Sequence, residues 1–243
     1  MKELETRRLK LRRITAADTQ TIFDTWASDP QVTEYLTWNP HESVEITEKI
    51  VASWLEDYEK EDCLRWGIQR KWDKKLIGMI DIVGYHHGAP VIGYCSGKKY
   101  WNRGYMTEAC RAVVEELFAL GFGTVVIEAM KDNIASNRVI EKVGFTKVLE
   151  YTQEKISEAK PYSAEMNSYR IWKDEEARYE WLRTSKLCPV CGKQLLDDPY
   201  EICAVCGWEN DPVQRKDPAF AGGANKMSLN EARIAYQEGR KIQ

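Results

Sequence analysis

The sequence predicts an α/β fold with a mixed sheet and helices on both faces, followed by a small cysteine-rich domain. The hydrophobic pattern between residues 90 and 151 runs strand, helix, strand, helix, strand. That order favours a mixed sheet covered by helices on its two faces. After about Lys173 the composition changes, and four of the seven cysteines fall within 19 residues, at Cys188, Cys191, Cys203 and Cys206. The chain is long enough for one sizeable core and a small appended module.

The first elements are predicted to be one strand and two helices. Residues 4–14 alternate apolar and charged side chains, as expected for a strand with one buried face. Thr15 and Asp18 have the spacing of a helix cap, and an apolar stripe continues from there as far as Pro30. A second helix is expected to begin near Ser43, because apolar side chains recur after it at helical spacing.

The rest of the chain supplies the remaining strands and the long helices. Helix stops are predicted at Gly121 and Gly144, because glycine commonly ends a helix in a left-handed conformation. Ser228 and Glu231 form a capping box that begins a last helix ending near Gly239. The predicted strands are 64–69, 76–83, 90–95, 124–130, 145–151 and 165–172, and the predicted helices are 107–120, 133–143 and a short one within 174–185.

Composition excludes several classes of protein. An apolar content of 43% and a charged content of 30% are typical of a soluble globular protein. The net charge of −3 gives no electrostatic reason to expect a nucleic-acid partner. No apolar run approaches ~18 residues and the N-terminus is charged, so neither a membrane span nor a signal peptide is expected. The protein is therefore expected in the cytoplasm.

Two separated segments resemble the GNAT acetyltransferases, closest to the branch that acetylates the N-termini of ribosomal proteins. One is the polar run from Tyr100 to Ala109, which passes through Gly104 into a helix. The other runs from Asp132 to Phe145 and contains Asn133 and Ser136. The resemblance covers about residues 4–172 and implies the GNAT acyl-CoA N-acyltransferase fold, with acetyl-CoA as cosubstrate.

The resemblance also implies an acetyl-CoA site. A helix N-terminus presents unpaired N–H groups and a partial positive charge, which suit a pyrophosphate. The family's loop pattern aligns on Trp101–Met106 with Gly104 matched, whereas Trp101, Asn102 and Met106 depart from it. The pyrophosphate cradle would be Arg103, Gly104, Tyr105, Met106 and Thr107. The strand edge beside the pantetheine arm would be Tyr94, Cys95 and Ser96, and Asn133 would hold that arm.

Chemistry at this site needs a neutral amine, a stabilised oxyanion and a proton for the departing thiolate. Glu128, on the strand before the donor helix, is the candidate general base, with a solvated strand residue as the equal alternative. Ser136 is the candidate donor to the thiolate, with a plain surface residue as the alternative, and Asn133 has the alternative of a simple helix cap. N–H groups near Cys95 and Ser96 are candidates for the oxyanion. Direct transfer needs no nucleophile, so Cys95 and Cys110 are expected, with Cys63, to be idle thiols.

The cysteine cluster reads as a metal site. Two Cys-x-x-Cys-Gly knuckles of identical spacing stand 11 residues apart, and four thiolates in this pattern fit a tetrahedral Zn²⁺. Iron–sulfur binding and a redox pair are the alternatives. The zinc ligands would be Cys188, Cys191, Cys203 and Cys206.

The same segment, about residues 186–240, resembles the bacterial cysteine-rich CPCC family in its Gly222-Gly223-Ala224-Asn225 string and the Ser-Leu-Asn-Glu-Ala-Arg run that follows. This family implies no defined activity. Tyr200 and Trp208 are expected to cover the metal, with a docking surface for a protein partner as the alternative.

The sequence thus predicts an N-acetyltransferase acting directly on a primary amine of a peptide N-terminus or small molecule. The alternative is a catalytically weak acetyl-CoA-binding protein whose zinc module recruits a partner. The acceptor would be recognised by the first two helices, the loop after Trp38 and residues 154–162, with Tyr35, Trp38 and Trp54 either in the core or along the acceptor groove. The predicted domains are 1–174 and 187–243, joined by a linker at 175–186. Whether the protein is a monomer or a dimer does not follow from the sequence.

Overall fold

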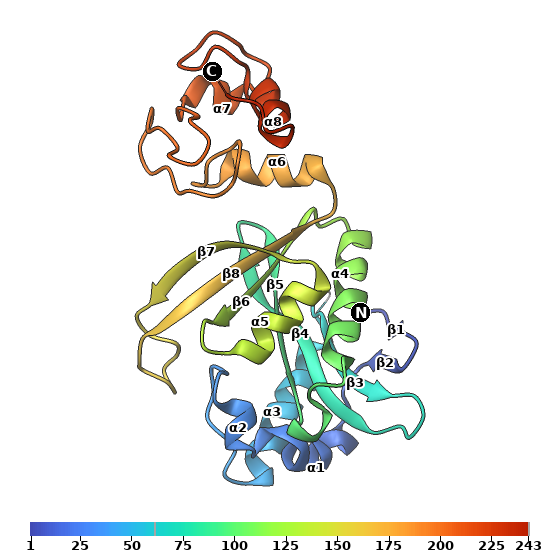
Figure 1. The fold of residues 1–243 in the computed structure, drawn as a ribbon. Helices are drawn as coiled ribbons and strands as arrows, with labels where there is room; N and C mark the ends of the chain where they lie inside the picture. Colours follow the sequence, from blue (N-terminus) through green and yellow to red (C-terminus); the bar gives the residue numbers. More distant parts are fainter. Residues whose placement is uncertain (61, 243) are drawn as a thin grey trace. The chain divides into compact units, whose positions relative to one another are not determined.

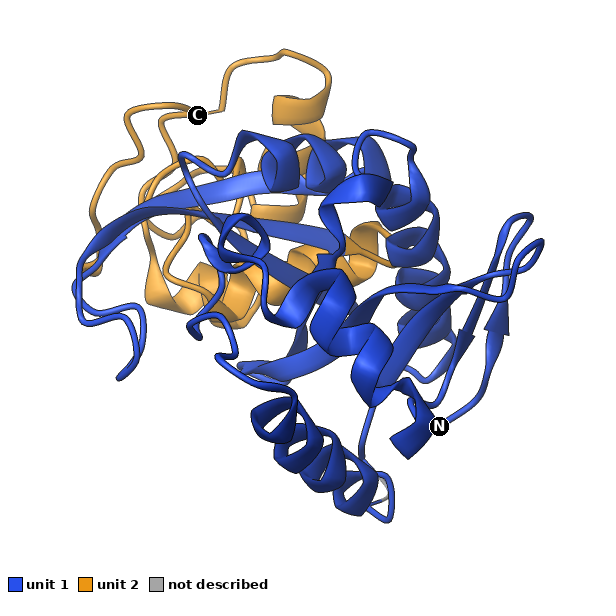
Figure 2. Ribbon diagram, turned by 90° about the horizontal axis from the view of Figure 1, so that it is seen from below, with its two compact units in different colours: residues 1–171 blue, residues 172–243 orange. Residues whose placement is uncertain are grey.

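A computed structural model describes residues 1–60 and 62–242. The chain divides into two compact units, Met1–Ile171 and Trp172–Gln243 (Figure 2). Within the described residues, no helix combines the length and the apolar character needed to cross a bilayer.

The first unit is built on one eight-stranded sheet in the order β1-β2-β3-β4-β5-β6-β8-β7 (Figure 1). Neighbouring strands pair antiparallel from β1 to β5 and between β7 and β8, whereas β5 and β6 are parallel. The sheet is therefore mixed, as predicted. Its strands are β1 (Leu4–Glu5), β2 (Leu9–Arg12), β3 (Arg65–Arg70), β4 (Leu76–His86), β5 (Ala89–Ser96), β6 (Thr124–Met130), β7 (Thr146–Gln153) and β8 (Ala164–Trp172).

Residues 4–14 form two short strands, so the prediction of one strand was wrong. The Thr6 N–H donates to the Leu9 carbonyl at 3.0 Å and closes a turn between them. The alternating pattern of the sequence is preserved, since Leu4, Leu9 and Leu11 all face the core. An alternating pattern alone does not reveal a reversal that keeps the same face buried.

Helices cover both faces of the sheet. α4 (Tyr105–Ala119) and α5 (Ile134–Val143) pack on one face, in a core that contains fully buried residues from α4, α5, β2, β3 and β6. α1 (Thr19–Ile22), α2 (Pro30–Thr33) and α3 (Val44–Asp57) pack on the other face against Met79 and Cys95. The two-sided arrangement predicted from the element order is confirmed.

Local sequence explains where the two long helices begin and end. α4 begins at Tyr105, two residues before the predicted start, because Gly104 adopts a left-handed φ of +73° and turns the chain into the helix. α5 is capped by Asn133, whose side chain accepts from the Ser136 N–H, and it ends at Gly144 with a φ of +115°. The left-handed conformation costs glycine far less free energy than it costs any residue with a Cβ.

The central strands β5 and β6 diverge along their length. β5 pairs with β4 as far as Ser96, but its pairing with β6 is confined to Val91 and Ile92. The Gly97 N–H donates to the Ile77 carbonyl of β4, and main-chain groups alternate sides along a strand. The N–H and C=O groups of Tyr94 and Ser96 therefore point away from β4, into the gap that β6 leaves.

Within its described residues, the second unit contains three helices and a core that includes buried cysteines. They are α6 (Glu175–Thr184), α7 (Pro212–Lys216) and α8 (Leu229–Gln237). α6 occupies the segment expected to be a linker, and two arginines tie it to the rest of the unit. Arg215 donates to the carbonyls of Leu182, Arg183, Ser185 and Leu187, at 2.7–3.2 Å. Arg233 donates to the Tyr179 carbonyl and lies 4.1 Å from the centre of its ring.

Candidate functional site

The loop before α4 presents main-chain donors at a helix N-terminus. Asn102 and Gly104 are both left-handed, with φ of +58° and +73°, so the main chain folds back on itself ahead of the helix. Gly104 is the N-cap and has no side chain to bond the first N–H groups of α4. These donors, from Tyr105 to Thr107, are therefore oriented to bind an anion.

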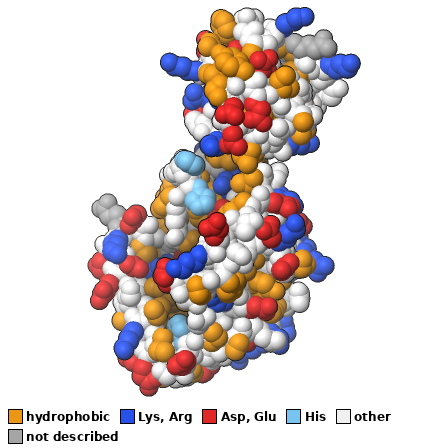
Figure 3. Space-filling view, turned by 90° about the vertical axis from the view of Figure 1, so that its left-hand side faces the viewer, with side chains coloured by type: hydrophobic (Ala, Val, Ile, Leu, Met, Phe, Trp, Pro, Cys, Tyr) orange, Lys and Arg blue, Asp and Glu red, His pale blue; other side chains and the backbone are white. Residues whose placement is uncertain are grey.

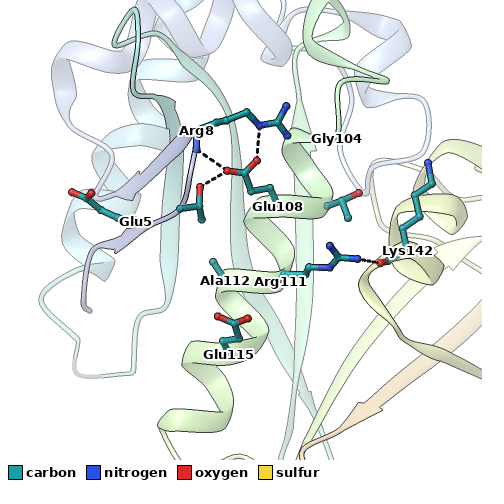
Figure 4. Close-up of a pocket in the computed structure, with 10 residues that line it drawn as sticks. Glu5, Arg8, Gly104, Glu108, Arg111, Ala112, Glu115 and Lys142 are labelled. Atoms are coloured by element: carbon teal, nitrogen blue, oxygen red, sulfur yellow. Dashed lines mark hydrogen bonds and ion pairs between the residues drawn. The ribbon is translucent and has the colours of Figure 1, made fainter.

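A cavity of about 600 Å³ lies along the start of α4 (Figure 4). Gly104 and Thr107 line it, together with the cationic side chains of Arg8, Arg111 and Lys142. Arg103, also assigned to the cradle, is exposed in the loop beside it. Glu5, Glu108 and Glu115 line the same cavity, so its side chains carry no excess of positive charge. The unpaired donors of the helix N-terminus are therefore the feature that suits a phosphate.

Arg8 is held in place by Glu108. Its Nε lies 2.6 Å from Glu108 Oε2, and its main-chain N–H donates to Glu108 Oε1 at 2.8 Å. Arg8 also donates to the Arg103 carbonyl and lies 4.5 Å from the centre of the Tyr105 ring. Sequence reasoning missed this residue, because Arg8 is about a hundred residues from the loop that it supports.

The edge of β5 supplies the second part of the predicted donor site. Tyr94 and Ser96 direct their main-chain groups into the gap between β5 and β6, whereas the main chain of Cys95 faces β4. The indole Nε1 of Trp101 donates to the Ser96 carbonyl at 2.8 Å. Trp101, which departs from the family's loop pattern, thus joins the loop to the strand edge.

Ser136 and Tyr94 meet across this gap. The Tyr94 hydroxyl lies 2.8 Å from Ser136 Oγ and 3.3 Å from the Ser136 carbonyl. Burial raises the pKa of Tyr94, so its hydroxyl stays protonated near neutral pH. Asn133 caps α5 through its Oδ1, at 3.1 Å from the Ser136 N–H, which leaves its amide nitrogen available to a ligand.

A buried amide, Asn137, fixes the start of α5 against β6 and β8. Its Nδ2 donates to the carbonyls of Met130 and Asn133 at 3.0 and 2.7 Å. Its Oδ1 accepts from Asn167 Nδ2 at 2.9 Å and from the Tyr169 hydroxyl at 2.6 Å. Sequence reasoning did not single out Asn137, although its spacing of four from Asn133 places it on the same side of the helix.

Glu128 lies on β6 beside the gap, and its side chain is on the face of the sheet away from α4 and α5. Its neighbours Ile127 and Ala129 pack in the core under α4 and α5, whereas Val126 and Met130 pack on the other face. Glu128 shares that second face, and it directly follows Ile127, the last β6 residue paired with β5. Its carboxylate accepts from Ser168 Oγ at 3.0 Å. The structure therefore places Ser136 and Glu128 on the two sides of one opening.

Cys95 and Cys110 are buried thiols. Burial raises the pKa of Cys95 and raises that of Cys110 to about 12. A thiol that stays protonated near neutral pH is a poor nucleophile. Their burial agrees with the expectation of idle thiols.

The aromatic residues near the first helices are divided between core and surface. Trp38 and Trp54 pack partly buried against the core under α1–α3. Tyr35 packs instead beside Met130, Ile156 and Met166, on the same face of the sheet as Glu128. Of the three, Tyr35 is therefore the one that shares a face of the sheet with Glu128.

The four clustered cysteines converge as predicted. All four Sγ atoms lie within 4.8 Å of one another. The Cys188–Cys206 and Cys191–Cys203 sulfurs are 3.5 and 3.6 Å apart. A tetrahedral Zn²⁺ with Zn–S bonds of ~2.3 Å needs sulfurs about 3.8 Å apart. The arrangement therefore fits a four-thiolate metal site.

The two aromatic residues of this module differ in exposure. Trp208 is fully buried and packs in the core that contains the cysteines. Tyr200 is 54% exposed. The expected covering role therefore fits Trp208 and does not fit Tyr200.

Comparison with known proteins supports both resemblances. Residues 8–146 match the acetyltransferase (GNAT) domain family, and residues 186–239 match the cysteine-rich CPCC family. The chain is 35% identical over 179 residues to YoaA of Bacillus subtilis (strain 168), an uncharacterized N-acetyltransferase, covering 71% of this chain and 98% of YoaA.

Solved structures share the fold at low identity. One is an acetyl transferase from Salmonella typhimurium that modifies the N-terminal serine of ribosomal protein L7/L12, with a TM-score of 0.59 and 19% identity over 70% of this chain and 97% of that one. Another is the Microcin C7 self-immunity acetyltransferase MccE in complex with acetyl-CoA and AMP, with a TM-score of 0.60 and 19% identity over 69% of this chain and 93% of that one. At this identity they establish the fold alone.

Proposed function

The chain belongs to the GNAT acetyltransferase family, and from that premise we propose that it transfers the acetyl group of acetyl-CoA directly to a primary amine of a peptide N-terminus or small molecule. The observation that carries this proposal is the gap between β5 and β6 beside the start of α4. A strand edge with outward-facing main-chain groups suits the amides of pantetheine, and a helix N-terminus suits the pyrophosphate.

The cradle for the pyrophosphate is proposed to be Arg103–Thr107, with Lys142 adding positive charge. Arg8, whose charge is paired with Glu108, would position the loop through the Arg103 carbonyl. The pantetheine arm would lie along Tyr94 and Ser96 and reach the amide nitrogen of Asn133. This placement brings the thioester to the opening that Ser136 and Glu128 border.

In the proposed reaction Glu128 first removes a proton from the bound ammonium. The amine nitrogen then attacks the thioester carbonyl, forming a C–N bond and an oxyanion, which the Tyr94 or Ser96 N–H groups would stabilise. Collapse of the oxyanion breaks the C–S bond. The second nitrogen proton is passed through Ser136 to the thiolate, so CoA leaves as a thiol.

The acceptor is proposed to approach on the face of the sheet that carries Glu128 and Tyr35. Residues 154–162 border this face, where Lys160 donates to the Thr33 and Glu34 carbonyls. An α-amine has an unperturbed pKa near ~8, so a carboxylate base suffices for it, whereas a lysine near ~10.4 needs more help. Peptide N-termini are therefore the first acceptors to test.

The second unit is proposed to bind zinc through Cys188, Cys191, Cys203 and Cys206. A small module with a limited core gains much of its folding free energy from such an ion. Thiolate ligands persist in a reducing compartment, which supports a cytoplasmic location. In place of the predicted domain at 187–243 with a linker at 175–186, we further propose a second domain that includes α6 and begins near Trp172, and that is available to a protein partner.

The experiment is an acceptor panel with purified protein and acetyl-CoA. It contains peptides that begin with serine, alanine or methionine, together with glucosamine and spermidine. Liquid chromatography–mass spectrometry detects the acetylated product and free CoA. Turnover that falls in Glu128→Gln and Ser136→Ala supports the proposal. Stabilisation by acetyl-CoA without product from any acceptor favours the catalytically weak binding protein instead.

A further inference from the structure

A histidine lies beside the proposed base. His86 is the last residue of β4, and its Nδ1 is 3.6 Å from Glu128 Oε1. The His86 side chain is 44% exposed and that of Glu128 is 19% exposed. Histidine side chains are visible at the surface in Figure 3. The imidazole therefore lies between a mostly buried carboxylate and the solvent, at a distance slightly longer than a hydrogen bond.

The other described groups around Glu128 cannot remove a proton from it near neutral pH. Ser168, on β8, donates to the carboxylate. Arg170, also on β8, is a buried cation. Tyr151, on β7, has its pKa raised to about 12 by burial and by the charge of Glu128. Among the described neighbours of Glu128, His86 alone carries an imidazole. Imidazole is the type of side chain that ordinarily exchanges protons between about pH 5 and 8.

The stoichiometry of acetyl transfer requires such an exchange. A protonated amine and acetyl-CoA give an amide, CoA thiol and one proton. In the proposed reaction the thiolate receives the second nitrogen proton, so the first one remains on Glu128 after each turnover. Because the acceptor must touch Glu128 on its open side, that proton needs another way to the solvent.

We propose that His86 carries this proton from Glu128 to the solvent and so resets the base in each catalytic cycle. The proton passes from the Glu128 carboxyl to His86 Nδ1, and the resulting imidazolium releases a proton to water. No bond other than these N–H and O–H bonds changes. The inference rests on the proposed function, since it assumes that Glu128 is the base.

The chain offers a matched control in His87. Both residues are exposed and adjacent, but His87 lies in the turn after β4 with a φ of +49°. Asparagine tolerates that conformation, so His86→Asn and His87→Asn are comparable variants. With the best acceptor of the panel, kcat is measured from about pH 5.5 to 8.5, the range in which histidine titrates. His86→Asn is expected to lower kcat about 10-fold near pH 7, with the KM for acetyl-CoA unchanged, whereas His87→Asn keeps the wild-type profile.

Chemical rescue distinguishes proton transfer from a structural role. Added imidazole is expected to restore kcat in His86→Ala, and to have no effect when Glu128→Gln is also present. Equal profiles for His86→Asn and His87→Asn, or a His86→Ala variant that imidazole does not rescue, would overturn the proposal. Full activity of Glu128→Gln alone would instead refute the assigned base in the proposed function.

Discussion

Replacement of Gly104 by aspartate tests the assigned pyrophosphate cradle. Gly104 is the N-cap of α4, is exposed and lines the cavity at the start of that helix. A Cβ built on it lies 3.5 Å from the nearest side-chain atom, Nη2 of Arg8, which is ordinary contact. The substitution therefore fits sterically and places a negative charge where a diphosphate is expected.

The magnitude follows from the left-handed backbone and from the charge. A non-glycine residue at a φ of +73° costs about 1 kcal/mol of folding free energy, and aspartate is among the residues that tolerate this region best. Two unit charges about 5 Å apart at an effective dielectric constant near ~20 repel by about 3 kcal/mol. That energy corresponds to a loss of about 10²-fold in affinity for acetyl-CoA.

The assay is isothermal titration calorimetry of acetyl-CoA, combined with thermal melting. Gly121→Asp is the matched control, because Gly121 has a φ of +98° and nothing within 4 Å of its Cβ. It follows the opposite end of α4. Gly121→Asp should lose more stability than Gly104→Asp, because aspartate is favoured at a helix N-cap and disfavoured at a helix C-terminus, whereas only Gly104→Asp should lose affinity. Gly104→Asn separates the effect of charge from that of shape, because asparagine has nearly the size of aspartate but no charge.

Equal acetyl-CoA affinities in Gly104→Asp and wild type would refute the cradle. Equal losses in Gly104→Asp and Gly104→Asn would show that shape matters and charge does not, which would contradict a site for pyrophosphate.

Three further predictions concern the catalytic serine, the metal site and acid stability. Ser136→Ala should lower kcat about 10²-fold with little change in acetyl-CoA affinity, measured by product formation and calorimetry; an unchanged kcat would remove Ser136 from the reaction. Cys188→Ser should release zinc and unfold the second unit alone, measured by elemental analysis and by separate melting transitions; wild-type protein without metal would contradict the site. Glu108 is partly buried, which raises its pKa, but bonds from Thr6 and Arg8 outweigh this and hold the pKa below its usual value. Its contribution to stability is therefore present above about pH 4.3 and is lost as pH falls below that value, so acid melts of Glu108→Gln should lose less stability there than wild type.

The sequence predicted a strand or helix well where the residues that define it lie within that strand or helix or at its ends. β6 matches its predicted range because a continuous apolar run bounded by turns defines a buried strand. Asn133 and Gly144 marked the two ends of α5 in the sequence. The hairpin hidden in residues 4–14 was missed because both of its strands bury the same face.

The site was less predictable because its contacts join distant parts of the chain. Glu128 was recognised as a carboxylate beside the donor helix, but its neighbours His86 and Ser168 come from strands that are adjacent only in the folded sheet. The divergence of β5 from β6 is likewise a property of strand pairing, and no single residue type encodes it. Only the family's two motifs indicated that this opening would exist.

The hydrogen bonds from Arg215 to the end of α6 determine where the chain can be cut into separately expressed fragments. The guanidinium satisfies carbonyls at the end of that helix which would otherwise have no helical partner. A fragment cut at residue 186 would leave the partly buried guanidinium of Arg215 facing water where Leu182, Arg183 and Ser185 had been. The C-terminal portion is therefore best expressed from Trp172 onward, and insertions meant to lengthen a spacer belong between Trp172, where β8 ends, and Asp174, which caps α6.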